Sequence, residues 1–135
     1  MARGAKRGSG ISEPSQRQLR AGELVRHALV DILAREEFRD PDLLGVIVTI
    51  GEVRCSPDLR HATVFCSPLG NTDKDAIEKT AAALGRAASF LRGRLGRQIE
   101  MKFTPQLHFT ADLSYDEGKA MEAVFRRPDV ARDLD

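Results

Sequence analysis

Apolar residues recur at helical spacing along residues 73–99 and give this segment two different sides. The apolar positions lie three or four residues apart, at Ile77, Ala81, Leu84, Ala88, Leu91 and Leu95. This spacing is typical of the buried side of an α-helix. The opposite side carries the cations Lys79, Arg86, Arg94 and Arg97. The pattern therefore predicts a helix that packs through one side and presents positive charge on the other.

Phe90 does not fit this helical pattern. At about 100° per residue, it projects among the cations and away from the apolar side. A bend near residues 87–89 would return Phe90 to the core, whereas a straight helix would leave it exposed as a surface platform. We favour the bend, because one helix of this length would also be unusual in a small domain. The segment then holds two helices that meet at residues 87–89, which we call the elbow.

A further helix is predicted over residues 15–38. Its apolar side is formed by Val25, Ala28, Leu29 and Ile32. It should stop at Asp40-Pro41, because the residue before a proline is disfavoured in the helical conformation. Thr72 or Asp73 can cap the helix that begins near residue 73.

Three segments have the pattern of strands. Residues 44–54 are β-branched and short, residues 61–67 alternate between apolar and polar, and residues 101–113 alternate around Leu107. The Ser-Pro-Asp turn at 56–58 predicts an antiparallel hairpin. We expect Phe65 and Phe109 to pack in the core rather than to form an exposed stacking platform. Beside the turn lie Arg54, Arg60 and His61, which either contact RNA or are solvated; we favour solvation.

The predicted order is α-β-β-α-(bend)-α-β, an α+β fold with two layers. Because a three-stranded sheet cannot bury its apolar side alone, the helices should cover one face of it. We expect a basic disordered tail over residues 1–15, the domain over 16–117 and a flexible tail over 118–135. The first tail either forms an arm that binds nucleic acid or has no binding role.

The composition indicates a soluble globular protein of 135 residues, with 41% hydrophobic and 30% charged residues. No apolar run is long enough to cross a bilayer, and the first residues lack the apolar centre of a signal peptide. Cys55 and Cys66 have no CxxC spacing, so we expect reduced packing residues in a cytoplasmic protein.

Positive charge is concentrated in two parts of the chain although the net charge is only +1. Residues 1–20 hold five cations against one carboxylate, and residues 86–102 hold five against one. The remainder therefore sums to −7. This distribution predicts a localised anion-binding surface. The alternative is a solvated helix face together with a solubilising tail.

Several motifs, in the same order, resemble the ribosome-binding factor A family. They are Arg39-Asp40-Pro41, Ser56-Pro57-Asp58-Leu59, the segment AASFLR at 87–92 and the segment TPQLHF at 104–109. The resemblance runs from about Gln18 to Glu117. It implies a type II KH-like fold, which agrees with the element order above. It also implies binding of the small (30S) ribosomal subunit and late maturation of 16S rRNA, including its 5′ end. Growth in the cold and release by a ribosome-associated GTPase are implied as well.

The elbow departs from the family pattern at one position. Ordinary KH modules hold the nucleic-acid backbone with a GXXG loop. The family has an Ala-x-Gly bend instead, which falls on Ala87-Ala88-Ser89 with serine in place of glycine. We expect Ser89 to cap the following helix through a bond from the backbone of Leu91 or Arg92. Gly93-Arg94-Leu95-Gly96 matches GXXG literally, but it lies too close to the third strand to be such a loop.

The predicted RNA-binding surface surrounds the elbow, where guanidinium groups and a helix N-terminus can meet phosphates. Arg94 and Arg97 share a side of the helix and are the strongest candidates. Arg92 projects nearer the apolar side, so a salt bridge within the protein is as good an interpretation for it as RNA contact. The complete candidate set is Arg86, Ala87, Ala88, Ser89, Arg92, Arg94, Arg97 and Lys102.

The sequence contains no pattern of an enzyme or a metal site. His27, His61 and His108 lie in separate elements without ligand spacing, and no phosphate-binding GxxxxGK[ST] loop occurs. We therefore expect a monomeric, non-enzymatic factor without cofactor, metal or membrane contact. The alternative is a protein–protein adaptor that docks an acidic partner through its basic helix.

Overall fold

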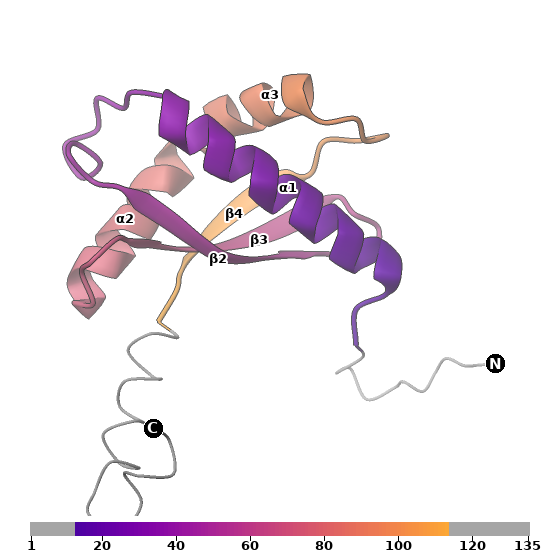
Figure 1. Cartoon of the computed structure of the whole chain (residues 1–135), viewed down its shortest axis with the longest axis horizontal. Helices are drawn as coiled ribbons and strands as arrows, with labels where there is room; N and C mark the ends of the chain where they lie inside the picture. Colours follow the sequence, from indigo (N-terminus) through magenta and orange to yellow (C-terminus); the bar gives the residue numbers. More distant parts are fainter. Residues whose placement is uncertain (1–12, 114–135) are drawn as a thin grey trace, which may run out of the picture.

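The computed structural model describes residues 13–113 as six elements in α-β-β-α-α-β order (Figure 1). They are α1 (Gln16–Arg35), β2 (Val48–Cys55), β3 (His61–Pro68), α2 (Lys74–Arg86), α3 (Ala88–Gln98) and β4 (Gln106–Ala111). The predicted element order is therefore confirmed. Residues 1–12 and 114–135 lie outside the described part. The predicted tails therefore also lie outside it, except for residues 13–15 of the first tail.

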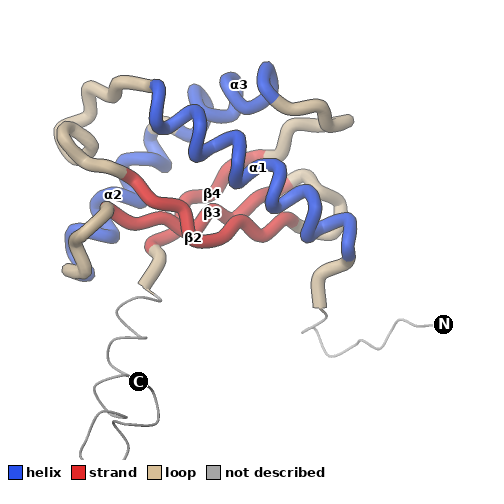
Figure 2. The backbone as a smooth tube through the Cα atoms, viewed as in Figure 1, coloured by secondary structure: helices blue, strands red, loops and turns tan. Residues whose placement is uncertain are grey.

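The three strands form one mixed sheet in the order β2-β3-β4. β2 and β3 are antiparallel and joined by the turn at 56–60, so the predicted hairpin is confirmed. β4 pairs with β3 in parallel, from His61 opposite Gln106 to Cys66 opposite Ala111. All three helices lie on the same face of this sheet, which gives the predicted two-layer architecture (Figure 2).

The core lies between the helices and the sheet. Ala62, Val64 and Cys66 alternate along β3 toward the helices and are fully buried. The apolar side of residues 73–99 is buried as predicted except at Ala88, which is half-buried, and Leu84, Leu91 and Leu95 are inaccessible to solvent. Both cysteines are free and buried. Burial raises the pKa of the Cys66 thiol to about 12, so this sulfur behaves as a small apolar group.

The first two predicted elements have wrong boundaries. α1 ends at Arg35 rather than at residue 38, because Glu36 is extended and its N–H caps the carbonyl of Ile32. β2 begins at Val48 rather than at residue 44. The connection turns instead, since the Leu44 N–H bonds to the Asp40 carbonyl and Gly45 has a φ of 71°. These turns bring residues 40–42 to the end of α2.

Two expectations about the strands also need correction. Residues 101–105 are a loop, so β4 is six residues long instead of thirteen. Phe65 points to the helix-free face of the sheet, because it alternates with the buried Val64 and Cys66. The guanidinium carbon of Arg54 lies 5.0 Å from the centroid of the Phe65 ring. Phe109 packs against the core as predicted.

Among residues 13–113, no helix has both the length and the apolar composition that crossing a membrane requires.

Candidate nucleic-acid interface

The elbow forms where predicted, between two separate helices. Asp73 caps α2 through a 3.0 Å bond from the Ala76 N–H, so it is the capping residue of the two predicted candidates. α2 ends at Arg86, and Ala87 leaves the helical geometry with φ −97° and ψ 7°. Ala87 and Ala88 are half-buried, whereas Ser89 is exposed. A ligand can therefore approach the elbow from outside.

The predicted capping role of Ser89 is wrong. The N-cap of α3 is Ala87, which makes no side-chain capping bond, and Ser89 lies inside the first turn. Within residues 13–113 the only non-glycine residue with positive φ is Leu59. Serine therefore fits at this position without strain, because the bend needs no left-handed residue. The segment 93–96 lies inside α3, which confirms that it is not a GXXG loop.

The bend does not bring Phe90 into the core, so that expectation is also wrong. Leu91 and Leu95 fix the buried side of α3, and Phe90 projects beside them with 46% of its surface exposed. The guanidinium carbon of Arg94 lies 5.1 Å from the centroid of its ring. A bend of one residue changes the axis of the helix but not which side of α3 faces the sheet.

Arg86 is not a free cation. Its Nε and one terminal nitrogen donate to Asp40 at 2.9 and 3.1 Å, and that terminal nitrogen also lies 3.1 Å from Asp42. The hydrogen bond from Arg86 lowers the pKa of Asp40, and the same contact raises the pKa of Arg86. Arg86 therefore ties the α1–β2 connection to the end of α2, and two carboxylates balance its charge.

Arg94 and Arg92 are also engaged within the protein. Arg94 forms an ion pair with Glu36 at 3.2 Å. Arg92 donates to the carbonyl of Thr104 at 2.8 and 3.1 Å and to that of Pro105 at 3.3 Å. Arg92 thus does not form the expected salt bridge: it anchors the α3–β4 loop through carbonyls, and its charge has no carboxylate partner in the described chain. Contact of Arg92 with RNA stays a prediction.

Arg97 and Lys102 are the candidates whose charge is most available. Both side chains are exposed, and neither forms an ion pair among residues 13–113. Arg97 lies in the last turn of α3, and Lys102 lies in the loop that follows. Among the predicted candidates, the available positive charge therefore lies at the C-terminal end of α3 and not at the elbow.

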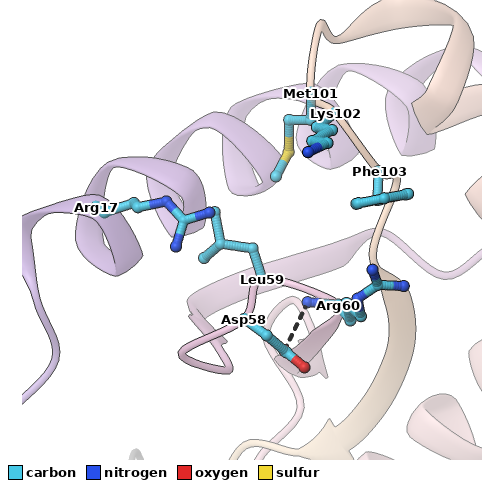
Figure 3. A pocket seen from close by; sticks show the side chains of 7 residues that line it. All are labelled: Arg17, Asp58, Leu59, Arg60, Met101, Lys102 and Phe103. Atoms are coloured by element: carbon cyan, nitrogen blue, oxygen red, sulfur yellow. Dashed lines mark hydrogen bonds between the residues drawn. The ribbon is translucent and has the colours of Figure 1, made fainter.

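Three residues outside the predicted candidate set line one pocket with Lys102. The Arg60 guanidinium carbon is 4.1 Å from the centroid of the Phe103 ring, so Arg60 is stacked and not simply solvated. Arg17, in the first turn of α1, donates to the Pro57 carbonyl at 3.3 Å. It lines the same pocket as Lys102 and Phe103 (Figure 3). These residues come from segments far apart in the sequence. The only local indication that they share a binding site was that Phe103 follows a lysine.

The fold also pairs two histidines that the sequence left apart. His61 Nδ1 and His108 Nε2 are 2.9 Å apart, and their rings stack with centroids 5.1 Å apart. The parallel register of β3 and β4 brings them together. The described segment contains no group of three or more His, Cys, Asp or Glu side chains that could hold a metal ion.

The comparisons with known proteins agree on one family. The family model described as ribosome-binding factor A matches residues 17–125. A ribosome-binding factor A of Hyphomonas neptunium is 59% identical over 131 residues, which is 97% of each chain. The crystal structure of ribosome-binding factor A from Thermus thermophilus has the same fold, with a TM-score of 0.55 at 24% identity over 72% of this chain and 97% of that one.

A homology model of the Thermus thermophilus factor, fitted into a cryo-EM map of a 30S–RbfA complex, is also similar. Its TM-score is 0.52 at 26% identity, covering 68% of this chain and 91% of that one. These similarities confirm the predicted KH-like fold. The match of residues 17–125 and the 59% identity together show that the chain belongs to the ribosome-binding factor A family.

Proposed function

We propose that this protein binds the small (30S) ribosomal subunit through 16S rRNA and assists the late maturation of that subunit. Membership of the family supports this, as does the 30S complex into which a similar factor was fitted. The finer parts of the proposal are 5′-end maturation of 16S rRNA, support of growth in the cold and release by a ribosome-associated GTPase. The protein acts in the cytoplasm as a monomer.

The exposed cations at the end of α3 are the observation that carries the RNA-binding part. Arg97 and Lys102 have no carboxylate partner among residues 13–113, so their charge is available to phosphates. Arg92 holds the loop that carries Lys102 against α3, which fixes the spacing of the two cations. Contacts of this kind recognise the shape and charge of RNA rather than its sequence.

The residues at the elbow contribute no free charge to the proposed RNA-binding surface. Ala87, Ala88 and Ser89 form a low, uncharged rim that RNA can approach closely. Arg86 and Arg94 reach phosphates only by leaving their carboxylate partners. Contacts that replace one ion pair by another gain little, so these two arginines contribute less to affinity than Arg97.

Binding alone can explain an effect on maturation. A protein that binds one conformation of rRNA more tightly than another shifts the population toward the first. No bond needs to be made or broken by the protein itself. The binding free energy is the quantity to measure.

Co-sedimentation with purified 30S subunits over a range of salt concentrations tests the binding site. Arg97→Glu should weaken binding about tenfold at moderate salt and reduce the slope of log K against log salt by about one. Lys74→Glu is the matched control, because Lys74 is exposed in the first turn of α2, away from the end of α3. Arg94 is better changed to Gln, since Glu at this position would face Glu36. Equal loss in the Arg97 and Lys74 variants would contradict the site.

The adaptor interpretation makes a different prediction for the same assay. An acidic protein partner would still be retained after nuclease digestion of the rRNA, whereas an rRNA contact would be lost. The maturation part is tested in cells that carry Arg97→Glu as their only copy. Precursor 16S rRNA with unprocessed 5′ ends should accumulate, more strongly at low temperature.

A further inference from the structure

A basic pocket lies where the start of α1, the β2–β3 turn and the α3–β4 loop meet (Figure 3). Its volume is about 540 Å³, which is within the range of small-ligand sites. The side chains that define its chemistry are Arg17, Asp58, Leu59, Arg60, Lys102 and Phe103. The pocket lies beyond the end of α3 and does not include the elbow.

An exposed aromatic ring is the first unusual feature of this pocket. Phe103 has 45% of its surface exposed although a side chain of this size is normally buried. Arg60 stacks on it at 4.1 Å, and Lys102 Nζ lies 5.7 Å from its centroid. Unpaired nucleic-acid bases stack on aromatic rings and on guanidinium planes. The pair Phe103–Arg60 offers both kinds of surface.

The pocket also has an excess of positive charge. Arg17, Arg60 and Lys102 line it, and none forms an ion pair with a carboxylate in the described chain. Asp58 is the only carboxylate among the lining residues. Its Oδ1 already accepts a 2.6 Å bond from the Ser56 hydroxyl and a 3.0 Å bond from the Arg60 N–H. An anionic ligand is therefore favoured.

The walls of the pocket are held in place before any ligand binds. Leu59 adopts a φ of 60°, which is uncommon for leucine, and its N–H bonds to the Ser56 carbonyl at 2.9 Å. This tight turn fixes the position of Arg60. On the other side, Arg92 binds the carbonyls of residues 104 and 105, next to Phe103. A site organised in this way loses little entropy when it is occupied.

We propose that this pocket holds one unpaired ribonucleotide of the bound rRNA. The base extends the existing stack of Phe103 and Arg60, and the flanking phosphates lie beside Arg17 and Lys102. The source of the RNA rests on the function proposed above, whereas the stacking site rests on the pocket alone. Bases inside a duplex have both faces covered by neighbouring base pairs, so the pocket selects single-stranded RNA over duplex.

A tryptophan reporter tests the stacking directly, because the chain contains no native tryptophan. In full-length Phe103→Trp, pentauridylate should quench the indole emission. An abasic ribose-phosphate pentamer and a blunt RNA duplex should not. Phe90→Trp is the matched comparison, since Phe90 is equally exposed but lies outside the pocket. Quenching in the Phe90 variant alone would overturn the proposal.

Two further ligands test whether the pocket binds RNA rather than a free nucleotide, and a base rather than any anion. Uridine monophosphate that quenches as strongly as the pentamer at the same concentration would identify a free nucleotide as the ligand and overturn the RNA assignment. Pentaglutamate that binds the pocket as tightly as pentauridylate does would reduce the pocket to a general anion site, which also overturns the proposal.

Affinity measurements on otherwise native chains separate stacking from charge. Phe103→Ala should weaken binding of pentauridylate about tenfold without changing its salt dependence. Lys102→Gln should reduce the slope of log K against log salt by about 0.7, and Lys74→Gln should leave it unchanged. If Phe103→Ala has no effect while Arg97→Glu still weakens 30S binding, the pocket is wrong and the proposed function stands. If Phe103→Ala weakens pentauridylate binding while Arg97→Glu leaves 30S binding unchanged, the α3 surface is rejected and the pocket is retained.

Discussion

Arg86 and Arg97 carry the same guanidinium group but have different roles, because their neighbours differ. Arg86 faces Asp40 and Asp42, which come from the connection before β2. Arg97 faces solvent at the end of α3 and has no carboxylate partner among residues 13–113. At the scale of single residues, the capacity to bind phosphate is therefore decided by which acids fold beside each cation.

The Asp40–Arg86 pair predicts a specific dependence of stability on pH. Because Arg86 lowers the pKa of Asp40, the pair stabilises the fold above the pKa that Asp40 has in the unfolded chain. The contribution is lost as the pH falls through the lowered pKa. Asp40→Asn should therefore decrease the free energy of unfolding at pH 7, and the difference from wild type should shrink below about pH 4.

Urea unfolding between pH 7 and about pH 2.5 measures this difference. The control is the same substitution in an Arg86→Met background, where the pH-dependent difference should be smaller but should not vanish, because the Asp42 N–H still lowers the pKa of Asp40. A pH-dependent difference of the same size in both backgrounds would show that Asp40 acts through its turn, in which it accepts from the Asp42 N–H, and not through Arg86.

At the scale of elements, packing distances decide which residues the helices tolerate. α1 approaches β2 so closely that a Cβ added to Gly22 would lie 2.5 Å from the carbonyl oxygen of Val53. This contact is with backbone, which cannot move without displacing the strand. In α3, by contrast, a Cβ at Gly93 would meet no atom within 4 Å.

Gly22→Ala should therefore lower the free energy of unfolding by about 1–3 kcal/mol through overpacking. Gly93→Ala should raise it by up to about 1 kcal/mol, because alanine favours the helix and nothing opposes the new methyl group. Urea unfolding of both variants measures the two effects. Destabilisation of similar size at both positions would show that α1 does not pack on β2 as closely as described.

The second helix pair shows which element-level predictions succeed. The elbow was predictable because one helix over residues 73–99 would have been too long. The residue that occupies the N-cap position at the elbow was not predictable, because Ser89 lies in the first turn of α3 and Ala87 takes that position. A bend constrains backbone dihedrals, and several positions in succession can supply it.

At the scale of the whole molecule, four cations without a carboxylate partner in the described chain extend from the end of α3 to the β2–β3 turn and the start of α1. They are Arg97, Lys102, Arg60 and Arg17. The last three line the basic pocket (Figure 3). Carboxylates engage Arg86 and Arg94 nearer the elbow. The basic surface is thus displaced from the position where the sequence concentrates its arginines.

A fragment of residues 13–117 should fold on its own, since the core that the structure describes is built entirely from residues within it. We expect one cooperative transition in urea, with the m-value of the full-length chain and a free energy of unfolding within about 0.5 kcal/mol of it. Circular dichroism and amide hydrogen exchange can follow the transition. A lower m-value would show that one of the removed segments contributes buried surface.

The sequence by itself determined the element order, the single helical layer and the buried sides of α2 and β3. These follow from local periodicity: spacing of three and four residues selects a helix, and alternation selects a strand. The family followed from motifs that are read along the chain. Local pattern also narrowed the cap of α2 to two neighbouring residues and predicted that both cysteines are packing residues.

Only the tertiary structure decided which side chains meet. Asp40 reaches Arg86 across 46 residues, and His61 reaches His108 across 47. Arg60 in the β2–β3 turn likewise meets Phe103 in the loop before β4. Periodicity assigns a side chain to a side of its own element, but contact between elements depends on register, turns and packing. For this reason the helical layer was predictable, and the charge available to RNA was not.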